Sequence, residues 1–252
     1  MQSKKVAIVT AAGKGIGMAC ASELAARGYA LALMSPSGSS RTLAKKLGGI
    51  GLDGSVTVTG DLQRLVAMTL KRWGRIDCVV NNTGNLARIT PGTKLRTGYA
   101  FDPEFDGVLL DIDDAEWHAS VDFYLLNSIR MARLVTPVMI GQGGGAIVNI
   151  SSFTVREPRL SYAISTPARA ALSSFTKLFA DRYARDRVRM NTVLPGFMEN
   201  REFPDSVLRT IPMARTGRLQ ELARTVAFLL SDDAGYITGQ SIHVDGGANR
   251  AI

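Results

Sequence analysis

The sequence Val6-Ala7-Ile8-Val9-Thr10-Ala11-Ala12-Gly13-Lys14-Gly15-Ile16-Gly17 begins with an apolar run and ends in a glycine-rich turn. The β-branched run over 5–10 is typical of a buried parallel strand, and the amphipathic residues 18–27 predict a helix after the turn. In such a unit Gly15 lets the backbone approach a pyrophosphate, and Gly17 lets the helix pack against the strand. The helix N-terminus then faces the anion. Although glycines gather in many turns, this context indicates a dinucleotide-binding site.

Length and composition are those of an ordinary globular protein. The chain has 252 residues, 46% of them hydrophobic, and a mean hydropathy of +0.07. It holds no run of 18 apolar residues, so we expect no membrane span. Because the first five residues lead directly into the first strand, we expect no signal peptide and a cytoplasmic location. Cys20 and Cys78 are expected to be reduced core thiols, and with His118 and His243 they match no familiar metal-ligand spacing.

The chain is basic, with a formal net charge of +8 and an isoelectric point near 9.8. Its lysines and arginines are scattered over many segments rather than gathered in one run or on one helix face. Nucleic-acid binding would need such a gathered patch with base-reading side chains beside it. A small phosphorylated ligand accounts for the charge equally well, so we expect no nucleic-acid partner.

Strand and helix patterns alternate along the chain. Apolar runs typical of strands lie at 5–10, 30–34, 55–59, 76–81, 145–150, 188–194 and 241–244. Helical patterns lie at 16–27, 39–47, 61–73, 114–140, 168–185 and 219–231. This alternation predicts an α/β fold with a doubly wound, Rossmann-like parallel sheet of about seven strands flanked by helices. No linker or low-complexity tract interrupts it, so residues 1–252 are expected to form a single domain.

Short motifs stand in a characteristic order from one end of the chain to the other. They are the opening turn from Thr10 to Gly17, Gly74-Arg75-Ile76-Asp77, Asn81-Asn82-Thr83-Gly84, Ile147-Val148-Asn149-Ile150-Ser151-Ser152, Arg189-Met190-Asn191, Pro195-Gly196 and residues 236–247. Together they resemble the short-chain dehydrogenase/reductase family over essentially the whole chain. The resemblance implies a nicotinamide cofactor, a small carbonyl or alcohol substrate, and a homo-oligomer, either a tetramer or a dimer.

The end of the second predicted strand bears on the choice of cofactor. An NAD site usually places a carboxylate there for the ribose 2′-hydroxyl, but residues 35–41 hold none. Small hydroxyls together with Arg41, and with Lys14 in the first turn, suit a 2′-phosphate, although a polar turn with solvated cations would look the same. We therefore expect NADP(H) rather than NAD(H). Including what the resemblance implies, the expected cofactor contacts are Thr10, Gly13, Lys14, Gly15, Ile16, Gly17, Ser35, Arg41, Asp61, Leu62, Asn82, Thr83, Gly84, Arg169, Pro195 and Gly196.

Among these contacts Thr83 departs from the family pattern, as does Ala11 in the glycine-rich turn, and the role of Asp61 depends on where the third strand is placed. Thr83 replaces the usual alanine beside the cofactor, and Ala11 replaces the usual first glycine of the turn. A tight turn tolerates that extra methyl group only in some conformations. Asp61 follows the predicted third strand, where the resemblance implies a contact with adenine.

The catalytic pattern departs further. The family combines Asn, Ser, Tyr and Lys, with the phenol as general acid and the cation lowering its pKa. Ser152 stands at the serine position. Residues 169–191 match, without a gap, the family segment that begins at the lysine, which puts Arg169 at the lysine position and Ser165 at the tyrosine position. Tyr124 stands at the asparagine position, counted back from Pro137 in the predicted helix over 114–140.

A tyrosine also lies near the expected place, in a different register. Tyr162 is followed four residues later by Thr166 instead of lysine. Pro167 suits the first position of a helix, so the helix that carries Arg169 is expected to begin near Thr166, as its N-cap, with Tyr162 in the loop before it. The first candidate for the general acid is Tyr162, the second is Tyr124, and the remaining one is a water molecule. Tyr162 alternatively packs beneath the loop without a chemical role.

Two segments have no pattern that identifies a substrate. Residues 85–110 form an unusually long connection, which we interpret as a lid or an oligomer contact. Residues 197–213 correspond to the family's mobile substrate loop, with Glu199 and Asn200 where a threonine is usual.

Three functions stay open on the sequence alone. The first is an NADP(H)-dependent carbonyl/alcohol oxidoreductase with an altered catalytic tetrad. The second is a non-catalytic or regulatory nucleotide-binding relative. The third is a nucleotide-independent lyase, because Ser152, Tyr162 and Arg169 resemble the residue set of halohydrin dehalogenases.

Overall fold

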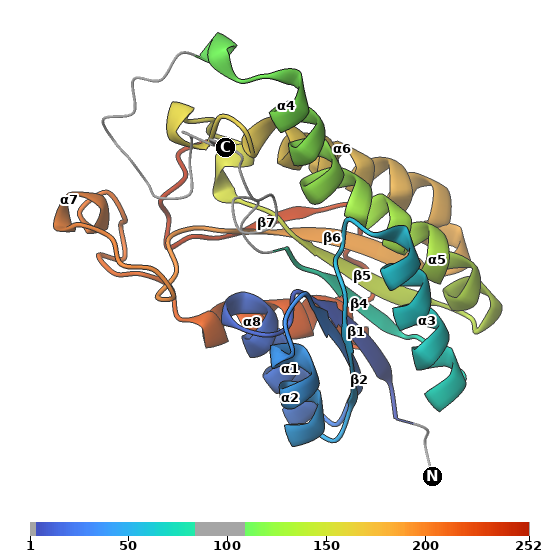
Figure 1. The fold of residues 1–252 in the computed structure, drawn as a ribbon. Coiled ribbons are helices and arrows are strands. Elements are labelled where there is room, and N and C mark those ends of the chain that lie inside the picture. The colour runs from blue at the N-terminus through green and yellow to red at the C-terminus, as the bar shows by residue number, and fades with distance from the viewer. Residues whose placement is uncertain (1–3, 84–108, 252) are drawn as a thin grey trace.

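A parallel seven-stranded sheet forms the centre of the protein (Figure 1). The computed structural model describes residues 4–83 and 109–251. The strands are β1 (Val6–Thr10), β2 (Ala30–Ser35), β3 (Ile50–Asp53), β4 (Cys78–Asn81), β5 (Gly145–Ile150), β6 (Val188–Pro195) and β7 (Ser241–Val244). Their order in the sheet is β3-β2-β1-β4-β5-β6-β7. The predicted doubly wound α/β fold is confirmed.

Helices cover both faces of the sheet. They are α1 (Gly15–Ala26), α2 (Ser39–Lys46), α3 (Thr59–Trp73), α4 (Asp114–Val121), α5 (Asn127–Gly141), α6 (Thr166–Tyr183), the short α7 (Asp205–Leu208) and α8 (Leu219–Leu230). Single 3-10 turns lie at Leu109–Asp111, Phe153–Val155, Leu160–Tyr162, Ala184–Asp186 and Asp232–Ala234, and a π-helical turn lies at Asp122–Leu126. Helices α1, α2 and α8 lie on one face, and α3, α5 and α6 lie on the other (Figure 1).

Alternation along the strands builds a separate core on each face. In β1, Ala7 and Val9 pack toward α1 and α8, whereas Ile8 packs toward α3, α5 and α6. All three side chains are fully buried, because successive residues of a strand point to opposite faces and helices cover both. Cys20 and Cys78 are buried in the first of these cores, as predicted.

The third strand was predicted in the wrong place. The β-branched residues 55–59 favoured a strand, but β3 is Ile50–Asp53, and residues 54–58 form a turn into α3. The backbone N–H of Ser55 donates to the Asp61 carboxylate at 2.8 Å, which fixes this turn. Because Gly51 interrupts the apolar run of β3, the hydrophobicity pattern does not indicate a strand there. A Cβ on Gly51 would lie 2.6 Å from the Arg41 Cα, so glycine is what allows α2 to pack so closely.

The predicted helix over 114–140 is present, but a wider turn interrupts it. Residues 122–126 form a π-helical turn between α4 and α5. The helix carrying Arg169 begins one residue earlier than expected, so Ser165 and not Thr166 is its N-cap, and Pro167 lies in its first turn. Tyr162 lies in the 3-10 turn before it, as predicted.

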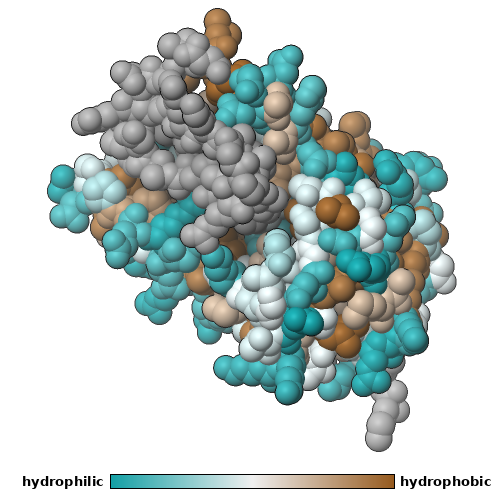
Figure 2. All heavy atoms as spheres, viewed as in Figure 1, coloured by the Kyte–Doolittle hydropathy of each residue, from teal (hydrophilic) through white to brown (hydrophobic). Residues whose placement is uncertain are grey.

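From β1 the chain adds strands on one side of the sheet, up to β3, and from β4 it adds them on the other side, up to β7, so the winding reverses between β1 and β4. Open α/β sheets bind their ligands at such a switch point. Polar side chains spread over the visible face, interrupted by isolated hydrophobic ones (Figure 2). Within residues 4–83 and 109–251, no helix is both long and apolar enough to cross a membrane, and no group of three His, Cys, Asp or Glu side chains could hold a metal ion.

Candidate active site

A cleft of about 1460 Å³ opens at the carboxyl ends of the strands. The glycine-rich turn from Thr10 to Gly17, called the phosphate turn below, lines it on one side with Gly13, Lys14, Gly15 and Ile16. Helix α1 begins at Gly15 and has no side-chain cap, so the N–H groups of its first turn are available to a ligand. The structure therefore places the predicted phosphate turn at the cleft, with the geometry of an anion site.

Hydrogen bonds tie the phosphate turn to β4. The Thr10 hydroxyl donates to the Asn82 carbonyl at 2.8 Å and accepts from the Asn82 N–H at 3.0 Å. The Asn82 side-chain amide also donates to the Ala11 carbonyl at 3.2 Å. Thr10 and Gly17 do not line the cleft themselves but support the turn that does. Thr83 lines the cleft, and Gly84 lies outside the described residues.

Ala11 sits in the left-handed region of the backbone, with φ of 45°. This conformation costs an alanine about 1–2 kcal/mol, whereas glycine adopts it freely and loses about 0.5–1 kcal/mol through its more flexible unfolded chain. We therefore expect Ala11→Gly to raise the free energy of unfolding by about 0.5–1 kcal/mol. Urea unfolding of the two proteins measures this difference. A loss of stability in Ala11→Gly would contradict the geometry of the turn.

The end of β2 presents hydroxyl groups to the cleft. Ser35, Ser37 and Ser39 line it, and their side chains are linked, with 2.7 Å between the hydroxyls of Ser37 and Ser39. Arg41 is not among the lining residues. Its guanidinium instead pairs with the Asp53 carboxylate at 2.9 Å, at the end of β3. Of the two cations expected at a 2′-phosphate, the cleft therefore contains only Lys14.

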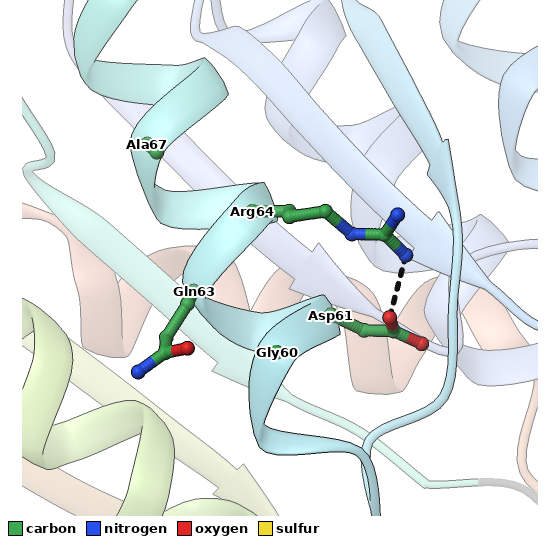
Figure 3. A pocket seen from close by; sticks show the side chains of 5 residues that line it. All are labelled: Gly60, Asp61, Gln63, Arg64 and Ala67. Carbon is green, nitrogen blue, oxygen red and sulfur yellow. Dashed lines mark hydrogen bonds and ion pairs between the residues drawn. The ribbon is translucent and has the colours of Figure 1, made fainter.

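Asp61 and Leu62 do not line the cleft either. Leu62 is buried in the core beneath α3, and Asp61 pairs with Arg64 at 2.6 Å beside a shallow surface pocket of α3 (Figure 3). The lining residues at this end are 54–57, which form the turn that Asp61 holds. Sequence reasoning missed them because the third strand was placed over them.

All five expected catalytic positions line the same cleft. They are Tyr124, Ser152, Tyr162, Ser165 and Arg169. Ser152 follows β5 and begins the 3-10 turn Phe153–Val155. Its Oγ accepts a hydrogen bond from the Thr154 hydroxyl at 3.0 Å, and that hydroxyl in turn accepts one from Thr166 at 3.0 Å. Because the Ser152 Oγ accepts in this chain of hydrogen bonds, its own hydroxyl proton is available to an acceptor in the cleft.

Tyr162 is half-buried on the 3-10 turn before α6. Its ring meets Phe153 edge-on, with 6.3 Å between the centroids. Burial raises the pKa of the Tyr162 phenol, and the positive charges of Arg201 and Arg159 partly oppose that shift. The phenol is therefore protonated at neutral pH and can donate a proton.

Arg169 lines the cleft from α6. Its guanidinium donates to the Ile150 carbonyl at 3.1 Å, and its Cζ lies 4.2 Å from the centroid of the Tyr124 ring. Ser165 is buried at the start of the same helix, and its hydroxyl donates to the Tyr162 carbonyl at 3.4 Å. The cation is thus held against an aromatic ring, and Ser165 supports the turn that carries Tyr162.

The loop after β6 forms another wall. Pro195 and Gly196 line the cleft, and a Cβ on Gly196 would lie 2.6 Å from the Asp245 Cβ, so only glycine fits there. Phe197 and Phe203 follow along the wall and contact each other edge-on at 5.0 Å. Asn200 reaches over the phosphate turn, 3.4 Å from where a Cβ on Gly15 would stand. No motif pointed to Asn200 as a contact with that turn.

The other sequence-predicted segments fall partly outside the structure. The Glu199 carboxylate accepts the backbone N–H of Leu219 at 2.8 Å, which anchors the loop to α8, and Glu199 does not line the cleft. The connection 85–110 lies outside the described residues except for Leu109 and Leu110, so the lid or oligomer role stays a prediction.

The sheet order and the glycine-rich turn define a Rossmann-like α/β protein. A family model described as enoyl-(acyl carrier protein) reductase matches residues 10–249. The 3-oxoacyl-(acyl-carrier-protein) reductase FabG of Escherichia coli K12 is 32% identical over 253 residues, which cover 96% of each chain. FabG of Staphylococcus aureus Mu50 is 30% identical over 261 residues, which cover 98% of this chain and 99% of its own. The chain therefore belongs to the short-chain dehydrogenase/reductase family.

Proposed function

We propose that the protein is an NADPH-dependent reductase of carbonyl compounds, with Tyr162 as general acid and Arg169 in place of the usual lysine. The observation that carries this proposal is the shared cleft. Ser152, Tyr162 and Arg169 line it together with the glycine-rich phosphate turn. A reductase needs these groups in one place because the carbonyl must meet a nucleotide, a hydrogen-bond donor and a proton source at once.

The charge of the cleft supports an anionic cofactor with an additional phosphate. Among the described residues that line it, the cations Lys14, Arg169 and Arg201 outnumber the single carboxylate, Glu202. The end of β2 offers three serine hydroxyls and lacks the carboxylate that would repel a 2′-phosphate. Hydroxyls and an ammonium group bind phosphate well through charge-assisted hydrogen bonds. The relatives named as reductases favour the same direction of reaction.

NADPH would lie between the phosphate turn and Arg169 and supply a hydride to the carbonyl carbon. The Ser152 hydroxyl, whose lone pair is already engaged by Thr154, donates to the carbonyl oxygen and holds it. The Tyr162 phenol donates the proton that the oxygen needs as negative charge develops there. Arg169 stays cationic at any working pH, so it binds ribose or phosphate, but it cannot carry a proton itself. The charges that favour the phenolate left behind are those of Arg201 and Arg159.

The raised pKa of Tyr162 predicts a pH profile for reduction. The protonated phenol is the active form, so activity is present below its pKa and lost above it. Because an ordinary phenol has a pKa of about 10 and burial raises that of Tyr162, we expect kcat/KM to be constant from about pH 6 to 9 and to fall only at about pH 10 or higher. A decline that already begins between about pH 7 and 8 would contradict Tyr162 as the acid.

A turnover assay tests the proposal. Purified protein is mixed with NADPH and a 3-oxoacyl thioester, the compound class that the relatives' name suggests, and with a panel of simple ketones, and the loss of NADPH absorbance is followed. We expect carbonyl-dependent oxidation of NADPH with at least one substrate. Nucleotide binding without turnover on any carbonyl would instead favour a non-catalytic nucleotide-binding protein.

A further inference from the structure

Arginine at the lysine position changes what the cleft must supply. Lysine ends in a compact ammonium group that three partners can hold, whereas guanidinium is a flat plane on a long, flexible stem. The Arg169 guanidinium donates to the Ile150 carbonyl at 3.1 Å, which anchors one edge of this plane to the end of β5. A flat surface against the face of the plane would fix its tilt about that anchor.

Tyr124 supplies that surface. The Arg169 Cζ lies 4.2 Å from the Tyr124 ring centroid, well inside the range of a cation–π contact. The ring itself is held firmly, because Tyr124 is 3% exposed and Phe123 meets it edge-on at 5.0 Å. A buried and packed ring can orient the longer side chain that lies against it.

The π-helical turn explains why the ring lies there. A π turn widens the helix by one residue and is frequently found at functional sites. In Asp122–Leu126 it brings two consecutive aromatic side chains, Phe123 and Tyr124, into the interior. The Asn127 side chain donates to the Phe123 carbonyl, which meets part of the hydrogen-bonding demand of the irregular turn. This support for the turn does not depend on Arg169.

We propose that Tyr124 is a positioning residue, whose ring face, and not its hydroxyl, orients Arg169 toward the nucleotide. This inference rests on the proposed function. It links two of the three departures from the catalytic pattern, tyrosine at the asparagine position and arginine at the lysine position. In this arrangement Arg169 depends on the Tyr124 ring for its orientation. The ring contributes to nucleotide binding only through Arg169.

A double-mutant cycle on NADPH affinity tests the coupling. We expect Tyr124→Leu to weaken NADPH binding about 10-fold, as loss of a desolvated cation–π contact implies, and Tyr124→Phe to keep affinity within about 3-fold of wild type. In the Arg169→Met background, Tyr124→Leu should weaken binding by less than about 2-fold, because the cation is already gone. Thermal unfolding of each variant shows that it is folded.

The same helix offers a matched control. Arg182 lies over the Tyr183 ring at 4.9 Å, a second cation–π pair that does not line the cleft. Tyr183→Leu should therefore leave NADPH affinity unchanged, whereas Tyr124→Leu should not. Kinetics separate the ring from the hydroxyl, because a positioning ring gives Tyr124→Phe a nearly unchanged kcat.

The possible failures are distinct. If the wild-type protein does not bind NADPH, the proposed function falls and this inference falls with it. If the wild-type protein binds NADPH but Tyr124→Leu weakens binding equally with Arg169 present and in the Arg169→Met background, only the inference is overturned. A loss of kcat of about 100-fold in Tyr124→Phe, with affinity kept, would also overturn it, since the hydroxyl would then be the working group.

Discussion

Replacing Tyr162 by phenylalanine is expected to lower kcat for carbonyl reduction by about 10²- to 10⁴-fold, the usual contribution of a positioned general acid. The substitution removes only the hydroxyl, and the edge-on contact of the ring with Phe153 can persist. NADPH affinity should change little, because Tyr162 lies on the turn before α6 and not on the phosphate turn. Steady-state kinetics with a nucleotide titration give both values.

A second half-buried tyrosine provides the control for this experiment. Burial raises the pKa of Tyr29 as well, but Tyr29 packs beside Cys78 in the core between the sheet and α1, away from the cleft. Tyr29→Phe should therefore keep the wild-type kcat. If Tyr162→Phe also kept it, Tyr162 would only pack beneath the loop, and the proton would come from another group or from water.

Gly17→Ala is the second large effect that we expect. A Cβ on Gly17 would lie 2.3 Å from the Ala11 carbonyl oxygen and 2.7 Å from the Asn82 Nδ2, which hydrogen-bond to each other. The phosphate turn must move to make room, so the free energy of unfolding should fall by about 1–3 kcal/mol. NADPH binding should weaken as well, because the displaced turn is the one that we propose holds the phosphates.

Gly60→Ala is the matched control, since both glycines lie in the first turn of a helix. A Cβ on Gly60 would meet nothing within 4 Å. Alanine there should leave NADPH affinity unchanged and raise the free energy of unfolding by up to about 1 kcal/mol, because glycine is the poorer helix former. Urea unfolding of both variants measures the contrast. Equal stability for Gly17→Ala and wild type would show that the turn is looser than described.

Most strands could be predicted because both faces of the sheet are covered, and a doubly covered strand is an apolar run. Prediction failed at β3, the edge strand, for a local reason. Close packing of α2 requires Gly51, which breaks the apolar run, while the following turn holds the β-branched residues Val56 and Val58. Here the packing of α2 against β3 outweighed the strand propensity of the β-branched residues, and the pattern of a single sequence does not show which helix packs on which strand.

The candidate site was predictable where a motif fixes the backbone. The phosphate turn and the residues around Arg169 fall where spacing put them, because each is a short segment attached to a sheet strand or helix. Arg41 was expected at the cleft but pairs with Asp53, and that pairing depends on how α2 packs over β3. Asn200 was missed because its place beside Gly15 depends on the path of a loop that is distant in sequence.

The most direct test of the proposed function is a calorimetric titration of the wild-type protein with NADPH and, in parallel, with NADH. We predict saturable binding of NADPH and binding of NADH that is at least about 10-fold weaker, because Lys14 and the serine hydroxyls at the end of β2 line the cleft and would bind a 2′-phosphate, which NADH lacks. Bound NADPH should also raise the melting temperature, since a ligand held only by the native state stabilises it. Equal affinity for the two nucleotides would contradict the assigned preference, and no binding of either would contradict the reductase itself.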